Sequence, residues 1–314
     1  MRVARLVLSV CISFMLSFCL SAQQTVTSSP QAQTFLQNSL STLAGGTARR
    51  IADSNNESGT SVFKATPPAG QAQSQAVWPQ RDPRTIAILN DAVTAAGGAQ
   101  AIHAARDFLA TGKIIYYWNN QEILGSVEIR GRGLDQVRMD SHMDDGLHYL
   151  VLNHGIGKLT TPDSTSNISG MNGFHMGLLI LPLPDLVAAL DDSLASFSFE
   201  GTEQLGSSSA YKIRVTRGIS AKLASSSTAN NLRSSEVFVD TTTSAVIAIR
   251  TSYYPRVTFA HPAVREVVFS DFRQVKGLIV PFSITEKVGG QPIHTIALDK
   301  IDFNVGITDE VFHQ

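Results

Sequence analysis

The feature that most constrains this chain is a two-residue alternation of apolar and polar side chains after Asp107. In residues 123–130, for example, Ile123, Val127 and Ile129 alternate with polar neighbours, and residues 211–215 repeat the pattern. This period places the apolar side chains on one face of a strand, so it predicts half-buried antiparallel strands. Because helical patterns do not recur between these strands, a curved antiparallel sheet or barrel is the expected architecture.

Further strands are expected where apolar stretches are separated by turn residues. The turn signals are Asn119-Asn120, Gly131 and Gly133, the run from Asp240 to Thr243, and Gly289-Gly290. The expected strands cover residues 109–118, 123–130, 134–140, 148–153, 195–203, 211–215, 236–240, 245–253, 265–272, 278–287 and 294–303.

A helix is predicted to open the domain. Asp82 is a suitable N-cap, Pro83 fits the first helical position, and Gly97-Gly98 ends the helix. Its apolar positions recur at helical spacing and share one face; they are Ile86, Leu89, Val93 and Ala96. A short helical turn over residues 99–106 is expected to follow.

One segment interrupts the alternation. Residues 161–173 are rich in Ser, Gly and Asn and are predicted to form a loop. Residues 174–190 are strongly apolar but contain Pro182 and Pro184, so we expect two short helical pieces. The segment is short for a membrane span, and a helix that is apolar all round must be buried. We therefore expect it to lie across the concave side of the sheet.

The N-terminus has the three parts of an export signal. Arg2 and Arg5 precede an apolar run over residues 6–20, and Ser21-Ala22 form a small-residue cleavage point. We expect a signal peptide at residues 1–22, cleaved near Ala22, and a periplasmic or secreted product. A non-cleaved anchor is the alternative.

Cleavage would remove Cys11 and Cys19, so the exported chain would contain no disulfide and no thiolate nucleophile. Residues 23–80 are rich in Gln, Ser, Thr, Ala and Pro. They are expected to be a low-order segment with patterns for one helix and one hairpin. Residues 81–314 are expected to form one main domain.

The net charge and the motif content of the sequence argue against several classes of function. The formal net charge is −1, and loss of Arg2 and Arg5 would make it −3. Basic side chains are not clustered, which disfavours nucleic acid as a partner. No Gly-x-Ser-x-Gly elbow or other recognisable catalytic motif occurs, so we expect no enzyme activity and no cofactor.

Three histidines raise the hypothesis of a metal site. His142, His148 and His154 are spaced by six residues, which keeps one face of a strand only if the strand is unbroken. Asp144-Asp145-Gly146 has the composition of a turn, which would break that face. A hairpin with exposed polar residues is therefore the favoured interpretation, and no metal site is expected.

The C-terminal block carries the most specific pattern. A strand ending in Asp271-Phe272 is followed by a glycine turn and a Leu-x-x-Pro strand that begins at Leu278. The last strand ends at Asn304, and Asp-x-x-Phe follows at residues 309–312. This order resembles the end of the lipoprotein-localisation superfamily, the outer-membrane lipoprotein carriers and their relatives. The opening at residues 95–99 resembles the start of exported members of that group.

The resemblance implies a mostly β (α+β) fold: an open, incomplete antiparallel β-barrel with helices covering the concave face. It also implies a non-enzymatic periplasmic protein that holds a lipid or lipoprotein acyl chain in an apolar cavity, as a carrier or sensor. The alternative is an envelope structural or protein-interaction module with a filled half-barrel. A cavity lined by apolar side chains would favour the first interpretation, and a filled interior the second.

The residues expected to line the cavity are inward-facing positions of the sheet and side chains of the covering segment. They are Ile114, Tyr116, Trp118, Val127, Ile129, Tyr211 and Ile213 from the sheet, and Phe174, Leu179 and Leu183 from the cover. The expected partners are a lipid or lipoprotein acyl chain and an envelope protein, with no transmembrane span in the mature chain.

Overall fold

The computed structural model describes residues 80–118, 121–168, 172–173, 181–217, 234–254 and 262–313. The predicted signal peptide, residues 23–79 of the predicted low-order segment, and the candidate ligand contacts Phe174 and Leu179 lie outside these residues. Among the helices that the structure describes, none has the length and apolar character needed to cross a bilayer.

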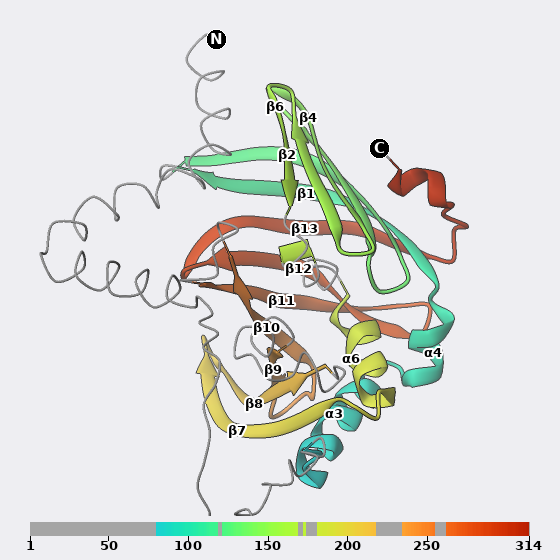
Figure 1. Cartoon of the computed structure of the whole chain (residues 1–314), viewed down its shortest axis with the longest axis vertical. Helices are drawn as coiled ribbons and strands as arrows, with labels where there is room; N and C mark the ends of the chain where they lie inside the picture. Colours follow the sequence, from blue (N-terminus) through green and yellow to red (C-terminus); the bar gives the residue numbers. More distant parts are fainter. Residues whose placement is uncertain are drawn as a thin grey trace, which may run out of the picture. The chain divides into compact units, whose positions relative to one another are not determined.

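The described residues form thirteen strands in one sheet, which Figure 1 shows. They are β1 (Asp107–Trp118), β2 (Gln121–Arg132), β3 (Gln136–Met143), β4 (Gly146–Asn153), β5 (Ile156–Thr161), β6 (Ser164–Ile168), β7 (Ser196–Leu205), β8 (Ser208–Thr216), β9 (Ser234–Asp240), β10 (Val246–Tyr253), β11 (Ala263–Val275), β12 (Leu278–Val288) and β13 (Gln291–Phe303). Each predicted strand is present, with its ends shifted by at most three residues.

The strand order shows how the sheet is assembled. It runs β6-β5-β4-β3-β2-β1-β13-β12-β11-β10-β9-β8-β7, so two antiparallel meanders are joined by the β1–β13 pair. Ile114 lies opposite Ile296 in that pair. Since β6 and β7 are the two ends of the order, the sheet is not closed. The predicted open, incomplete antiparallel barrel is confirmed.

The predicted loop over residues 161–173 is wrong for its first half. Residues 164–168 form β6, which pairs with β5, and Thr165 lies opposite Thr160. β6 is an edge strand with half-buried and exposed side chains, so it needs no apolar alternation. Its backbone pairing with β5 defines it, and side-chain pattern does not reveal that pairing.

The helices begin and end as their local sequence predicts. In α3 (Pro83–Ala95), the Asp82 carboxylate accepts hydrogen bonds from the N–H groups of Arg84 and Thr85, both at 3.3 Å. At the other end, Gly97 has φ +114°, and a Cβ there would lie 2.4 Å from the Gly277 carbonyl oxygen. Glycine is therefore required where α3 docks on the β11–β12 turn. α4 (Ala99–Ala104) follows.

The helices lie on one face of the sheet, which we call the inner face (Figure 1). α3 contacts β7 and β9, while α6 (Pro182–Asp191) contacts β10 as well as α3 and α4. The expected cover is thus present as α6 for the described part of residues 174–190. A row of inner-face isoleucines is nearly free of solvent: Ile114, Ile129, Ile213, Ile284 and Ile296 are at most 2% exposed.

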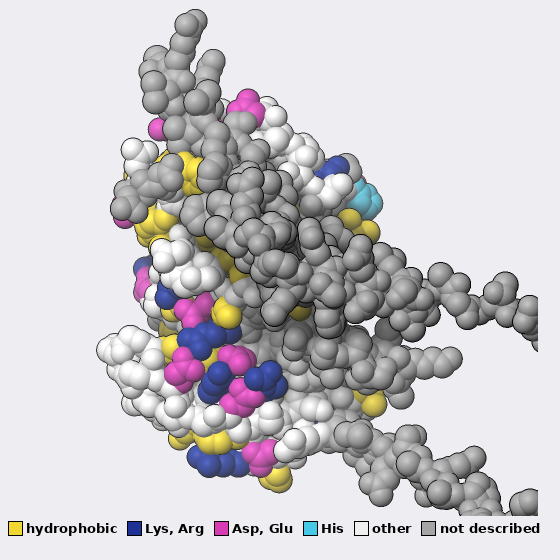
Figure 2. Space-filling model, turned by 60° about the vertical axis from the view of Figure 1, so that its left-hand side comes forward, with side chains coloured by type: hydrophobic (Ala, Val, Ile, Leu, Met, Phe, Trp, Pro, Cys, Tyr) yellow, Lys and Arg dark blue, Asp and Glu magenta, His cyan; other side chains and the backbone are white. Residues whose placement is uncertain are grey.

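The opposite face, which we call the outer face, carries a row of charged side chains and, among the described residues, no helix. Lys212, Arg214, Arg250 and Lys287 form ion pairs with Glu200, Glu203, Glu236 and Glu266. Figure 2 shows basic and acidic side chains interspersed in one patch. Beneath the row, Ala210, Phe238 and Ala248 are 0% exposed. The Arg250 guanidinium lies 4.5 Å from the centroid of the Phe238 ring, so its charged head and apolar stem cover this small cluster.

The C-terminal block closes the domain. The Asn304 side chain accepts a hydrogen bond from Arg106 N–H and donates one to the Ala104 carbonyl, both at 2.9 Å. It thereby links the end of β13 to the segment between α4 and β1. Asp309–Phe312 then forms the 3-10 helix η2, which contacts β3 and β4 and buries Phe312.

Candidate binding site

The inner face brings together five of the eight described residues that were expected to contact a ligand. Ile114, Val127, Ile129, Ile213 and Leu183 belong to one apolar cluster, and each is at most 6% exposed. These side chains come from β1, β2, β8 and α6. The sheet and its cover therefore share one continuous apolar interior.

The aromatic candidates lie at the margins of this cluster. Tyr116 is half-buried and packs against it. Tyr211 is half-buried and lies beside Phe199, with ring centroids 6.0 Å apart. Trp118 is half-buried at the end of β1, on the same face as Tyr116 by strand alternation. Contact of any of these residues with a ligand remains a prediction.

α6 is fastened at both ends by an arginine. Near its start, Arg217 pairs with the Asp185 carboxylate and donates to the Asp185 carbonyl oxygen at 2.9 Å. At its end, Arg81 donates to the carbonyl oxygens of Leu190 and Asp192, at 2.9 and 2.8 Å. A cation at a helix C-terminus satisfies its free carbonyl groups and opposes the helix dipole.

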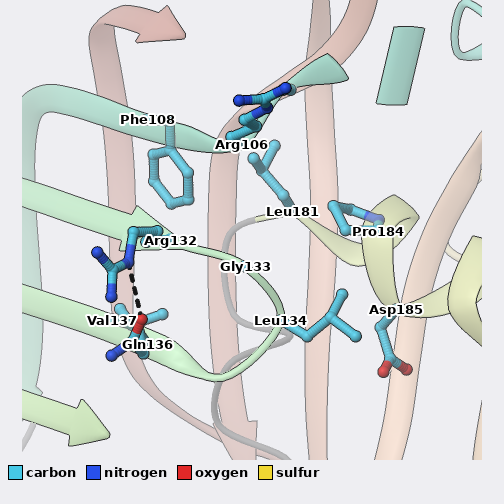
Figure 3. Close-up of a pocket in the computed structure, with 12 residues that line it drawn as sticks. Arg106, Phe108, Arg132, Gly133, Leu134, Gln136, Val137, Leu181, Pro184 and Asp185 are labelled. Atoms are coloured by element: carbon cyan, nitrogen blue, oxygen red, sulfur yellow. Dashed lines mark hydrogen bonds between the residues drawn. The ribbon is translucent and has the colours of Figure 1, made fainter. Parts of the chain in front are cut away.

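A small crevice opens where α6 begins. Figure 3 shows Leu181, Pro184 and Asp185 on one side, with Leu134 in the β2–β3 turn across from them. The crevice has a volume of about 20 Å³, which suits one water molecule. Ligand pockets usually have volumes of about 300–1,000 Å³. An acyl chain would therefore need displacement of α6 to use this entrance.

Sequence analysis did not identify a buried cluster of ionisable residues on the inner face. Arg265 in β11, Glu286 in β12 and His294 in β13 are 3%, 7% and 6% exposed. Arg265 Nε donates to Glu286 Oε1 at 2.8 Å, and Nη2 donates to Oε2 at 3.3 Å. Each residue lies two positions from an inward-facing residue of its own strand. These neighbours are Val267, Ile284 and Ile296 respectively. A polar residue at an apolar position of the alternation was the signal available in the sequence.

The cluster holds one compensated ion pair and neutral polar groups. Although burial alone would raise it, Arg265 and then His294 hold the pKa of the Glu286 carboxyl below its ordinary value. Burial lowers the pKa of His294, with Glu286 opposing this shift. Burial raises the pKa of Tyr116 to about 12, and the Glu286 carboxylate adds to the rise. At neutral pH the cluster thus contains charged Arg265 and Glu286 beside uncharged His294 and Tyr116.

His294 also carries an unsatisfied atom. Its Nε2 is buried without a hydrogen-bond partner among the described residues, and it lies 3.8 Å from Glu286 Oε2. The His294 and Tyr116 rings are adjacent, with centroids 5.5 Å apart. Buried polar atoms in proteins are nearly always hydrogen-bonded, so this nitrogen calls for an explanation.

The lowered pKa of His294 predicts that stability falls on acidification from about pH 6.5, the ordinary His value. The unfolded chain takes up the proton near that pH, whereas the folded chain takes it up only at lower pH, so acid favours unfolding. Glu286 adds a further loss as pH falls below 4.5. Thermal unfolding between pH 7.5 and 5 should show a smaller decline in Tm for His294→Gln than for the unchanged protein. Equal declines in Tm for the two proteins would show that His294 does not cause the loss of stability.

The histidines considered for a metal site do not converge: His148 lies opposite Ser141 across the β3–β4 hairpin, so it points to the other face from His142. His148 Nε2 is 2.9 Å from Asp145 Oδ1, while His154 Nδ1 is 2.9 Å from Asp135 Oδ2. His142 is exposed, and the predicted turn separates it from β4. Within the described ranges, no group of three or more His, Cys, Asp or Glu side chains is arranged to hold a metal ion.

Several solved structures are similar to this chain at low sequence identity. No protein-family model and no curated protein sequence matches the chain. A LolA superfamily protein from Nitrosomonas europaea is 11% identical with a TM-score of 0.46, covering 73% of this chain and 97% of that chain. A DUF1329 family protein from Desulfovibrio piger is 12% identical with a TM-score of 0.45, covering 73% and 97%. Lipoprotein LppX of Mycobacterium tuberculosis is 13% identical with a TM-score of 0.25, covering 72% and 98%.

One of these solved structures is of a LolA superfamily protein, from the group that the C-terminal block resembles. At identities of 11–13% and TM-scores of 0.25–0.46, the chemistry of the site follows from its own side chains.

Proposed function

We propose that the chain is an exported, non-enzymatic binding protein that holds the acyl chain of a lipid or lipoprotein on the inner face, beneath α6. The observation that carries this proposal is the way in which α6 covers the apolar face. α6 buries Leu183, Leu186 and Val187 over the apolar face, and arginine side chains fasten its two ends. A helix held in this way can separate from the sheet without breaking a strand ladder.

The energetics allow such binding. Burying a methylene contributes about 0.8 kcal/mol, so a 16-carbon chain gains on the order of 12 kcal/mol. Association and ordering cost about 4–15 kcal/mol, depending on how much must be immobilised. Binding in the micromolar range therefore requires the ligand to cover the apolar surface that is exposed when α6 separates from the sheet. Export to the periplasm, by the predicted signal peptide, would bring the protein to such lipids.

One observation favours a second function, that of an envelope protein-interaction module. The crevice at α6 has a volume of only about 20 Å³, and the inner-face isoleucines are almost fully buried. A filled interior stabilises the domain without a ligand. A partner protein would then use the outer face or the strand edges.

A locked cover distinguishes the two functions. His103 Nε2 on α4 lies 3.4 Å from Asp191 Oδ2 on α6, and both side chains are exposed. The chain from residue 23 onward has no cysteine, so His103→Cys with Asp191→Cys can be joined selectively by a short bismaleimide. We expect the joined protein to bind a fluorescent acyl-chain probe at least ~10-fold more weakly, the equivalent of about 1.4 kcal/mol.

The control is the same double variant without the crosslinker, which should bind like the unchanged protein. Equal binding with and without the crosslink would show that α6 does not gate the ligand. No binding of the probe to any form would favour the interaction module.

A further inference from the structure

The buried polar cluster lies in register with the apolar row of the inner face. Ile114, Ile296 and Ile284 are cross-strand partners on β1, β13 and β12. One step along the same strands, the partners are Tyr116, His294 and Glu286. Two residues of a strand span about 6.6 Å, so a chain lying on the apolar row would reach the polar row directly.

The charges of the cluster decide what polar group could sit there. Arg265 is engaged by both carboxylate oxygens of Glu286, so this pair carries no net charge. The carboxylate of a fatty acid would add a buried negative charge next to Glu286, which is costly without a new cation. An ester carbonyl adds no charge and needs only a donor.

The unsatisfied nitrogen is a donor in one of the two neutral tautomers of His294. A neutral imidazole can carry its proton on Nε2, and that N–H could donate to a carbonyl oxygen. The neighbouring Tyr116 remains protonated, since burial raises the pKa of its hydroxyl to about 12. Both side chains are therefore uncharged polar groups, suited to an uncharged acceptor.

We propose that Tyr116, His294 and the Arg265–Glu286 pair receive the ester carbonyl of an acyl lipid, so that the site selects acyl esters over free fatty acids. This inference rests on the proposed function and deepens it. Tyr116 was expected to be a ligand contact from sequence, whereas His294, Arg265 and Glu286 are new. The acyl chain would extend from this cluster along Ile114 and Ile296.

The test compares two ligands of equal chain length on the exported chain at pH 8. 1-Monolauroylglycerol and lauric acid each displace a fluorescent acyl-chain probe, and the ratio of their affinities is measured. We expect the ester to bind at least ~10-fold more tightly, the equivalent of about 1.4 kcal/mol. In His294→Phe, which keeps a ring but removes both nitrogens, the ratio should fall to about one.

Two further variants separate recognition from folding. His294→Gln retains a donor and should keep part of the preference for the ester. Ile296→Val, on the apolar row, should weaken both ligands equally and leave the ratio unchanged. Melting temperatures identify any variant that fails to fold.

A ratio near one in the unchanged protein, or an unchanged ratio in a folded His294→Phe, would overturn the inference while leaving acyl binding intact. If neither ligand binds, the proposed function itself fails.

Discussion

Replacing Arg265 with Met is expected to lower the free energy of unfolding by about 3–5 kcal/mol, the usual effect of breaking a buried ion pair. The substitution leaves the Glu286 carboxylate buried and removes its hydrogen bonds of 2.8 and 3.3 Å. His294 Nε2 lies 3.8 Å from Glu286 Oε2 and makes no hydrogen bond among the described residues, so it does not replace the lost cation. Urea denaturation measures the effect, and an unchanged m-value shows that compactness is kept.

A double variant shows whether the loss of stability comes from the buried, unpaired carboxylate of Glu286. Arg265→Met with Glu286→Leu removes both charges, and such replacements are often neutral or stabilising. We therefore expect the double variant to recover most of the stability lost in the single one. The deficit of the single variant should also shrink at low pH, where Glu286 becomes protonated. A double variant as unstable as the single one would show that the two groups do not act as a pair.

Replacing Phe238 with Ala on the outer face is expected to cost about 3–5 kcal/mol, typical of a large cavity in a core. Phe238 is 0% exposed although it lies on the outer face, because Arg250 and Lys212 cover its ring. For a domain of this size, 1 kcal/mol shifts Tm by about 2–4 °C, so a fall of roughly 10 °C is expected.

Two comparisons sharpen this second test. Leu124→Ala changes a side chain that is 62% exposed, and it should alter stability by less than ~0.5 kcal/mol. Acyl-chain binding should be unaffected by Phe238→Ala below its Tm, because the inner face is untouched. If Phe238→Ala lowers the free energy of unfolding by less than ~1 kcal/mol, the charged row alone stabilises the outer face.

Features determined by local chemistry were predictable from the sequence. α3 was predicted because Asp82, Pro83 and Gly97 act on the backbone within a few residues of themselves. The alternating strands were predicted for the same reason, since each needs only its own period of two. β5 and β6 were not predicted, and β6 is an edge strand, which is defined by its pairing with β5. The polar sequence of β6 is typical of a loop when that partner is unknown.

The sequence by itself thus determined the strands, the opening helix and an apolar interior on one side of an antiparallel sheet. It also placed Ile114, Val127, Ile129, Ile213 and Leu183 in that interior. Only the tertiary structure showed that Arg265, Glu286 and His294 meet there. Arg265 and Glu286 are 21 residues apart in the chain and on neighbouring strands. Periodicity assigns a side chain to a face of its own strand, whereas electrostatic pairing depends on the register between strands, which is decided only when the whole sheet forms.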